Sequence, residues 1–278
     1  MTISKLFPRA IGTITLLTVF LSSYAQIETD RPDFTNSPNL VPEGALQIET
    51  GFVLENDEFS GSLYSSCSVR NVTFNTTLLR FGLTKNIELR ANYSYNQKTI
   101  LACEYTSPLF DPHPSFFEPN KGFQTSFIGF KTNLYKSDKV SIGFLGHLYI
   151  PELASGNFSK ADGQKIAPEF LIPMSFALTD KLGIACQYGL TWDGLTPNPT
   201  SIYSVSFGYK ITDQLGVFVE PYGFVTNHGG EKHLINGGFT YLINNHLQLD
   251  LTGGYGLNEA APNNFLSCGA SFLLFDKE

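Results

Sequence analysis

The chain has 278 residues, a formal net charge of −7 and only 15% charged residues, while aromatic residues make up 14%. An acidic chain without a long Lys/Arg run gives no support for nucleic-acid binding. So few charges are unusual for a soluble globular domain, whereas many aromatic residues and glycines suit alternating strands in lipid.

The first 25 residues have the pattern of a secretory signal peptide. Lys5 and Arg9 form a positive n-region, residues 11–21 form a short apolar stretch, and Ser23 and Ala25 are small residues at the positions that signal peptidase reads. The apolar stretch is too short for an uncleaved anchor, since a spanning helix needs about 20 apolar residues. We therefore expect residues 1–25 to be removed, and the loss of two positive charges takes the formal charge from −7 to −9.

Residues 26–43 form a polar, Pro-rich segment on the periplasmic side, which we expect to be extended or irregular. Two interpretations of its charged residues Asp30, Arg31 and Asp33 stay open. They enter a barrel lumen as a small plug, or they belong to a disordered lead in the periplasm, as termini often do.

Beyond this segment the dominant pattern has a period of two residues. Apolar and polar residues alternate completely over residues 87–95 and again over 247–252, which places one set of side chains on each face of a β-strand. Such runs of around 10–14 residues fit or slightly exceed the ~9–11 residues with which a tilted strand spans a bilayer. Twelve runs begin near Gly44, Arg70, Asn86, Gly122, Lys139, Lys165, Lys181, Ser201, Gln214, Lys232, His246 and Asn264.

The connections between the runs alternate strictly between tight polar turns and longer segments. This asymmetry is typical of outer-membrane barrels, which have short periplasmic turns and long external loops. The longer segments are roughly 56–69, 97–121, 152–164, 194–200, 225–231 and 257–263. We therefore predict an all-β fold, a transmembrane antiparallel up-and-down β-barrel of about twelve strands over residues 44–275, with both termini periplasmic. A secreted β-sandwich or soluble barrel would instead have strands of about 5–6 residues and no alternation of turn length.

The two faces of the predicted strands differ in polarity. One face is aliphatic and aromatic, as lipid requires, while the other carries glycines and more charge than a dry core tolerates, which suits a water-filled lumen. The candidate lumen-lining residues are Arg80, Glu88, Arg90, Lys131, His147, Glu169, Lys210, Glu220 and Asp250. They form either a charged constriction that selects solutes or ion pairs that rigidify the wall, and intramembrane charges usually pair with one another.

Several short blocks carry a family resemblance that covers almost the whole mature chain. They are residues 28–32 (ETDRP), 39–44 (NLVPEG), 46–51 (LQIETG), 79–83 (LRFGL), 87–90 (IELR), 238–242 (GFTYL) and 254–258 (GYGLN). The sequence resembles the outer-membrane family labelled "putative meta-pathway of phenol degradation", often described as a transporter. This implies a channel-like barrel in the outer membrane of a Gram-negative bacterium, in contact with outer-membrane lipid and inserted by the barrel-assembly machinery. The aromatic stretch 272–275 near the end provides the expected assembly signal.

The remaining chemistry-bearing residues do not point to an enzyme. His147 is a candidate for a membrane-embedded hydrolase, but it lacks the neighbouring nucleophile pattern that such catalysis needs. Cys67 and Cys103 fall in predicted loops on the same side, so a disulfide and free thiols both stay open. We predict no metal and no cofactor. The expected function is the passage of small solutes. Only the family label suggests that these solutes are small hydrophobic or aromatic compounds. The alternatives are a structural or surface-binding barrel with a plugged lumen, and a lipid hydrolase.

Overall fold

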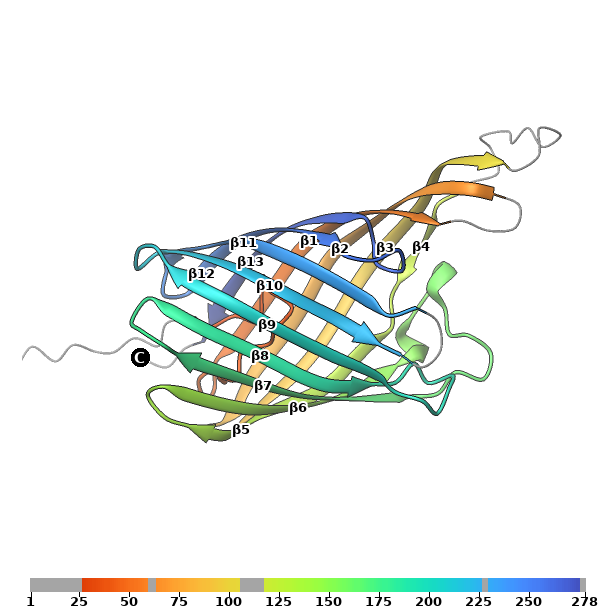
Figure 1. Cartoon of the computed structure of the whole chain (residues 1–278). Helices are drawn as coiled ribbons and strands as arrows, with labels where there is room; N and C mark the ends of the chain where they lie inside the picture. Colours follow the sequence, from red (N-terminus) through yellow and green to blue (C-terminus); the bar gives the residue numbers. More distant parts are fainter. Residues whose placement is uncertain (1–26, 60–63, 106–117, 227–229, 276–278) are drawn as a thin grey trace, which may run out of the picture.

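The computed structural model describes residues 27–59, 64–105, 118–226 and 230–275, so the expected signal peptide lies outside the described residues. Within these ranges the regular elements of the chain are β-strands and two short 3-10 helices (Figure 1). The strands are β1 (Leu46–Phe59), β2 (Tyr64–Thr84), β3 (Ile87–Tyr105), β4 (Asn120–Phe123), β5 (Ser126–Lys136), β6 (Val140–Ile150), β7 (Ala167–Ala177), β8 (Leu182–Thr191), β9 (Thr200–Lys210), β10 (Leu215–Val225), β11 (Lys232–Asn244), β12 (Leu247–Gly256) and β13 (Asn264–Leu274). The helices are η2 (Pro151–Leu153) and η3 (Gly156–Phe158).

The strands form one closed antiparallel sheet. Strands that are consecutive in sequence pair with each other, except β4 and β5. β1 pairs with β13 through Leu46 opposite Leu274, and the pairing of β2 with β3 completes the ring. The short strand β4 and the longer β5 both pair with β3, at successive positions along it. They therefore share one place in the wall, and the barrel has the twelve wall positions that the sequence predicts. The predicted fold class is confirmed.

The tight turns lie where the sequence places them, but the first two long loops are shorter than predicted. β1 continues to Phe59 and β2 begins at Tyr64, so most of residues 56–69 is strand rather than loop. β3 likewise reaches Tyr105, and residues 106–117 lie outside the described residues. The polar residues there suggest a loop, but pairing with the adjacent strand satisfies their backbone groups and overrides that preference.

β2 and β3 form a hairpin that extends beyond the other strands (Figure 1). Cys67 and Cys103 stand directly opposite each other in this hairpin and form a disulfide with an S–S distance of 2.02 Å. The two cysteines therefore lie in paired strands, not in the loops to which the sequence pattern assigns them.

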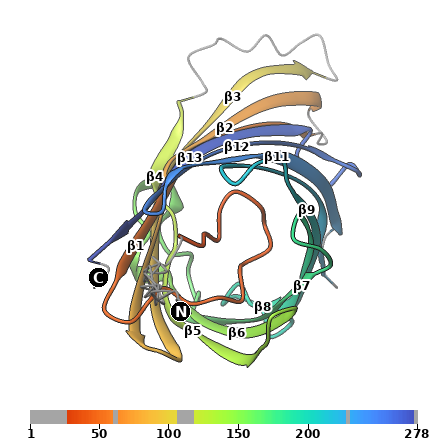
Figure 2. The same ribbon diagram turned by 90° about the vertical axis from the view of Figure 1, so that its left-hand side faces the viewer.

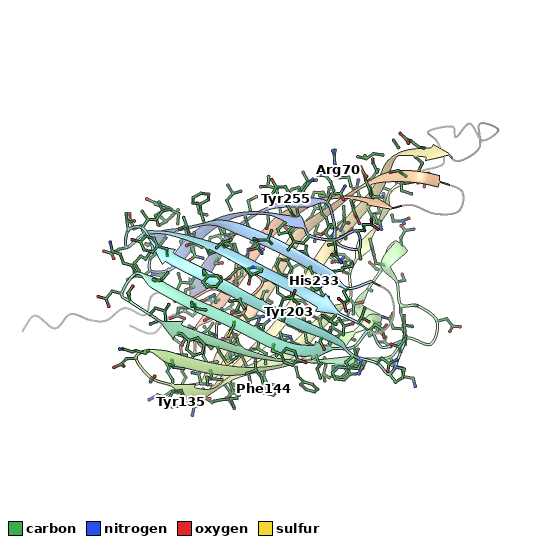
Figure 3. The ribbon with its side chains drawn as sticks, viewed as in Figure 1. Arg70, Tyr135, Phe144, Tyr203, His233 and Tyr255 are labelled. Atoms are coloured by element: carbon green, nitrogen blue, oxygen red, sulfur yellow. A yellow bond between two sulfur atoms is a disulfide. The ribbon has the colours of Figure 1, made fainter. Side chains whose placement is uncertain are left out.

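The outer face of the barrel is apolar, and its inner face carries buried charge. Phe239, Tyr255 and Leu266 are each more than half exposed, and side chains such as Tyr135 and Tyr255 stand out from the wall (Figure 3). By contrast, Arg80, Lys131 and other charged side chains are completely buried inside. This distribution is the inverse of a soluble protein and is that of a barrel in lipid. Among the described residues, none belongs to a helix with the length and apolarity to cross a membrane.

The barrel has a turn end, with the tight turns, and a loop end, with the long connections. The chain approaches β1 from the turn end, where Ile27 N donates to Asn245 O at 2.9 Å. The last described strand, β13, also finishes there, with Leu274 opposite Leu46. Both ends of the described chain therefore lie at one end of the barrel, as an even number of wall positions requires.

Candidate functional site in the barrel lumen

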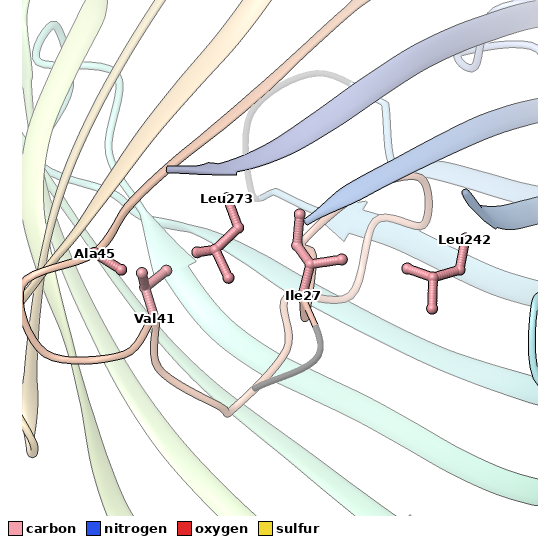
Figure 4. Packing of buried hydrophobic residues seen from close by; sticks show 5 residues of the cluster. All are labelled: Ile27, Val41, Ala45, Leu242 and Leu273. Atoms are coloured by element: carbon pink, nitrogen blue, oxygen red, sulfur yellow. The ribbon is translucent and has the colours of Figure 1, made fainter. Parts of the chain in front are cut away.

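Residues 27–43, here called the N-terminal segment, fold back inside the ring of strands (Figure 2). At the turn end, Ile27 and Val41 pack with Ala45, Leu242 and Leu273 in a buried apolar cluster (Figure 4). Gly82 of β2 lies against the end of the segment, where a Cβ at this position would clash with Pro42 O. The lumen therefore holds protein where the inner-face charges predict water.

Asp30 is the centre of a buried charge cluster that joins the segment to the wall. Its carboxylate contacts Arg90 Nη1 at 2.6 Å, Lys131 Nζ at 2.9 Å and Arg80 Nε at 3.5 Å. Arg80 also pairs with Glu49 and Glu88, each at 2.8 Å. Burial alone raises the pKa of Asp30, but Arg80, Lys131 and Arg90 together hold that pKa well below its ordinary value. Three cations thus balance three carboxylates, one of which belongs to the segment.

Arg31 forms a second connection, to β12 and β2. Its guanidinium binds both carboxylate oxygens of Asp250, at 3.0 and 3.2 Å, and also donates to Thr76 Oγ1 at 3.0 Å. A Cβ on Gly51 or Gly269 would come within 2.5 Å of the guanidinium. The absence of a side chain at these two wall positions is therefore what makes room for Arg31.

Glu220 forms a third connection through the backbone of the segment. Its carboxylate accepts from Phe34 N at 2.7 Å and from Thr35 N at 2.8 Å. Asn236 on β11 holds the same carboxylate at 3.0 Å. The Phe34 ring stacks on Tyr222, with centroids 4.6 Å apart. This side of the contact combines hydrogen bonds to the backbone with aromatic packing.

Asp33 follows Arg31 in the segment but has a different electrostatic setting. Burial raises its pKa well above the ordinary value, and the neighbouring Glu220 raises it further, against a hydrogen bond from Ser206. The pKa values of Asp30 and Asp33 are therefore shifted in opposite directions, although the two residues are only three positions apart, because cations surround only Asp30.

Eight of the nine candidate lumen residues face inward and are buried, namely Arg80, Glu88, Arg90, Lys131, His147, Glu169, Glu220 and Asp250. Lys210 differs because it is exposed at the turn end. His147 is held on both ring nitrogens, by Glu169 at 2.9 Å and by Arg90 at 3.1 Å, and it stacks on Phe127. Among the described residues, no group of three or more His, Cys, Asp or Glu side chains is arranged to hold a metal ion.

Some contact residues were not among the candidates. Glu49 and Gln187 lie on the inner face that the alternation predicts, but nothing in the sequence distinguishes them from other polar residues there. Gln187 Oε1 accepts from Asn36 N and from Asn36 Nδ2. Thr35 and Asn36 lie in a stretch without periodicity, so the sequence carries no signal for their contacts.

The N-terminal segment separates two cavities. The turn-end cavity measures about 460 Å³ and is lined by residues that include Asp213 and Lys210. The loop-end cavity measures about 500 Å³ and is lined by residues that include His147 and Phe127. Arg31 and Asp33 line both cavities, so the segment is the partition between them.

Comparison with known proteins places the chain in a family. Residues 29–274 match the model of the family described as "Putative MetA-pathway of phenol degradation". The chain belongs to this family. No curated protein sequence matches it.

Two solved structures are similar to the fold at low sequence identity. An outer-membrane channel from Pseudomonas putida F1 superposes with a TM-score of 0.61 at 11% identity, over 89% of this chain and 100% of that one. The translocator domain of the autotransporter NalP from Neisseria meningitidis superposes with a TM-score of 0.50 at 10% identity, over 83% of this chain and 89% of that one. Both likenesses concern the fold, and the description of the first as an outer-membrane channel agrees with the barrel.

Proposed function

We propose that this chain is an outer-membrane channel for small solutes in which the N-terminal segment is the plug. The observation that carries the proposal is the position of Arg31 and Asp33 between two cavities inside a closed wall. A solute that crosses the lumen has to pass this partition, so movement of the segment controls passage.

The surroundings of the segment support this role. The wall presents apolar side chains to lipid, and a structure that superposes over its whole length is an outer-membrane channel. The family description names phenol degradation, which suggests small aromatic compounds as solutes. Cavities of about 460 and 500 Å³ have room for molecules of that size.

Deletion of residues 27–43 tests the proposal. In planar bilayers we expect low conductance from the wild-type protein and several-fold higher conductance after the deletion. Folding is verified by the altered gel mobility of the unheated barrel. Equal conductance of the two folded forms would contradict the plug, and absence of conductance from both would contradict the channel.

A structural or surface-binding barrel is a second candidate, and the hairpin that extends beyond the other strands favours it. Such a barrel keeps its lumen plugged, so it predicts conductance only after the segment is deleted and none from the wild-type protein. Low but reproducible conductance of the wild-type protein therefore separates the channel from the structural barrel.

We also propose that residues 1–25 direct export, that the barrel-assembly machinery inserts the chain, and that the turn end faces the periplasm. The mass of the protein extracted from outer membranes tests the first step. A mature chain that begins near Gln26 is expected, and a chain that retains Met1 would contradict cleavage.

A further inference from the structure

The barrel wall has an irregular seam between β3 and β5. The ladder runs from Ile87 opposite Thr132 up to Ala91 opposite Ile128, and pairing resumes only at Tyr95 opposite Phe123 in β4. Residues 92–94 of β3 therefore face residues 124–127 without regular backbone pairing. All residues of this seam are among those that the structure describes.

Side chains replace part of the missing backbone ladder. Asn92 Oδ1 accepts from Phe127 N at 2.6 Å, and Ser94 Oγ donates to Gln124 Oε1 at 2.9 Å. One backbone bond, from Gln124 N to Ser94 O, measures 3.0 Å. A seam closed largely by side chains opens at lower cost than a continuous ladder, because rotation of a side chain leaves the strands in place.

Other interruptions of the wall differ in how they meet the loop-end cavity. The gaps between β6 and β7 and between β9 and β10 contain Pro173 and Pro221, which lack an N–H donor. Neither proline lines the loop-end cavity. The gap between β1 and β2 reaches that cavity through Thr76 and Thr77 on β2, and Glu49, which borders the gap on β1, lines it too. The β2–β3 ladder is also interrupted between Phe74 and Thr77, where Thr76 and Ser94 line the cavity, but there regular pairing resumes after a single residue of β3.

At the seam between β3 and β5 the cavity is lined from both edges. Asn92, Tyr93 and Ser94 line it on β3, and Gln124 and Phe127 line it on the facing edge. The cavity therefore extends to the wall at a place where three residues of β3 have no regular ladder partners.

The height of the seam places it in the apolar part of the membrane. Tyr93 is the sixth residue after Ile87, the first residue of β3, so at ~3.3 Å per residue and a tilt of ~45° it lies roughly 14 Å from the turn end. The apolar band of such a barrel is about 25 Å tall. The outer side of the seam carries Tyr93, Phe123 and Ile128, which are 42–51% exposed.

We propose that the seam is a lateral exit, through which a small apolar solute passes from the loop-end cavity into the surrounding lipid. The proposal rests on the proposed channel function and names the route and the solute class. Phe127 forms the inner side of the exit, and Tyr93 and Phe123 form its outer side. An apolar solute thus leaves the loop-end cavity for lipid past Phe127, without crossing the charged partition at Arg31 and Asp33.

A disulfide across the seam tests the route. The sealed variant carries Ser94→Cys and Gln124→Cys, in a parent in which Cys186→Ser and Cys268→Ser remove the free thiols. The matched control carries Ala91→Cys and Ile128→Cys, which join the same two strands at the regular pair just below the seam. The probe is N-phenyl-1-naphthylamine, an apolar amine that fluoresces on entering lipid, added to intact cells.

We expect the sealed variant to slow probe entry several-fold, and reduction with dithiothreitol to restore it. The control pair and the parent, reduced in parallel, should change little, and ion conductance of the purified sealed protein should equal that of the parent. Unchanged entry with the disulfide verified by mass spectrometry would overturn the exit, as would equal slowing by both pairs.

If the engineered disulfide does not form, the Asn92→Ala variant tests the route instead. This change removes the side-chain acceptor of Phe127 N and so weakens the seam. Faster probe entry supports the exit, and unchanged entry overturns it. Failure of the proposed function looks different: a parent that neither conducts ions nor admits the probe would overturn the channel itself. A parent that admits the probe equally well when sealed overturns only the lateral route.

Discussion

The N-terminal segment contacts the lumen in two regions of contrasting chemistry. On the side of β1, β2, β3 and β5, Asp30 is bound by three buried cations within 3.5 Å. On the side of β9 and β10, Phe34 packs on Tyr222 and Phe224 and lies against the cluster of Leu145, Leu171 and Ile202. The first region is ionic. The second, here called the apolar region, combines apolar packing with the hydrogen bonds that Glu220 accepts from the segment backbone.

Each region fixes the segment in a different way. A buried charge requires its partners, and loss of one partner leaves an uncompensated charge in a medium of low polarity. Apolar packing has no such dependence, because its contribution scales with the area removed from water. The ionic region therefore sets where the segment binds, while the apolar region adds affinity in proportion to the apolar area that it buries.

The largest expected effect comes from Asp30→Ala, which leaves Lys131, Arg80 and Arg90 with one carboxylate too few. We expect docking of the segment to weaken by about 3–5 kcal/mol. Hydrogen–deuterium exchange of residues 27–43 measures this directly, since several amides of the segment donate to wall side chains. The control is Asp30→Ala combined with Lys131→Met, which restores neutrality and should recover part of the protection. Equal exchange in the single and double variants would contradict the ionic account.

A smaller effect is expected from Phe34→Ala in the apolar region. Loss of the buried Phe34 side chain should weaken docking of the segment by about 1.5–3 kcal/mol, the usual value for burying such a side chain. The matched control is Phe34→Leu, which keeps most of the apolar area. Exchange faster than in Asp30→Ala would reverse the ranking of the two regions.

The smallest effect is expected from Lys210→Gln. This side chain lies at the exposed turn end, outside both contact regions, and surface substitutions of this kind change stability by about 0.5 kcal/mol or less. Exchange of residues 27–43 should equal that of the wild type. Faster exchange would show that the ionic region extends to the turn end.

The sequence predicts the barrel far better than it predicts the interior. Alternation places Glu88, Arg90 and Asp250 on the inner face, since a period of two residues follows from strand geometry alone. The path of the N-terminal segment carries no such period, so the partners of Asp30 and Arg31 emerge only in three dimensions. The extension of β2 and β3 also escapes prediction, because their polar residues resemble a loop until the partner strand is known.

Many of the hydrogen bonds that hold the segment come from its main chain. Glu49 accepts from Asp30 N, Glu88 from Val41 N, and Glu220 from Phe34 N and Thr35 N. Such bonds recognise the curve of a peptide rather than the identity of its side chains. Proline has no N–H to donate, so it is the substitution that all four of these positions should reject, whatever their side chains contribute.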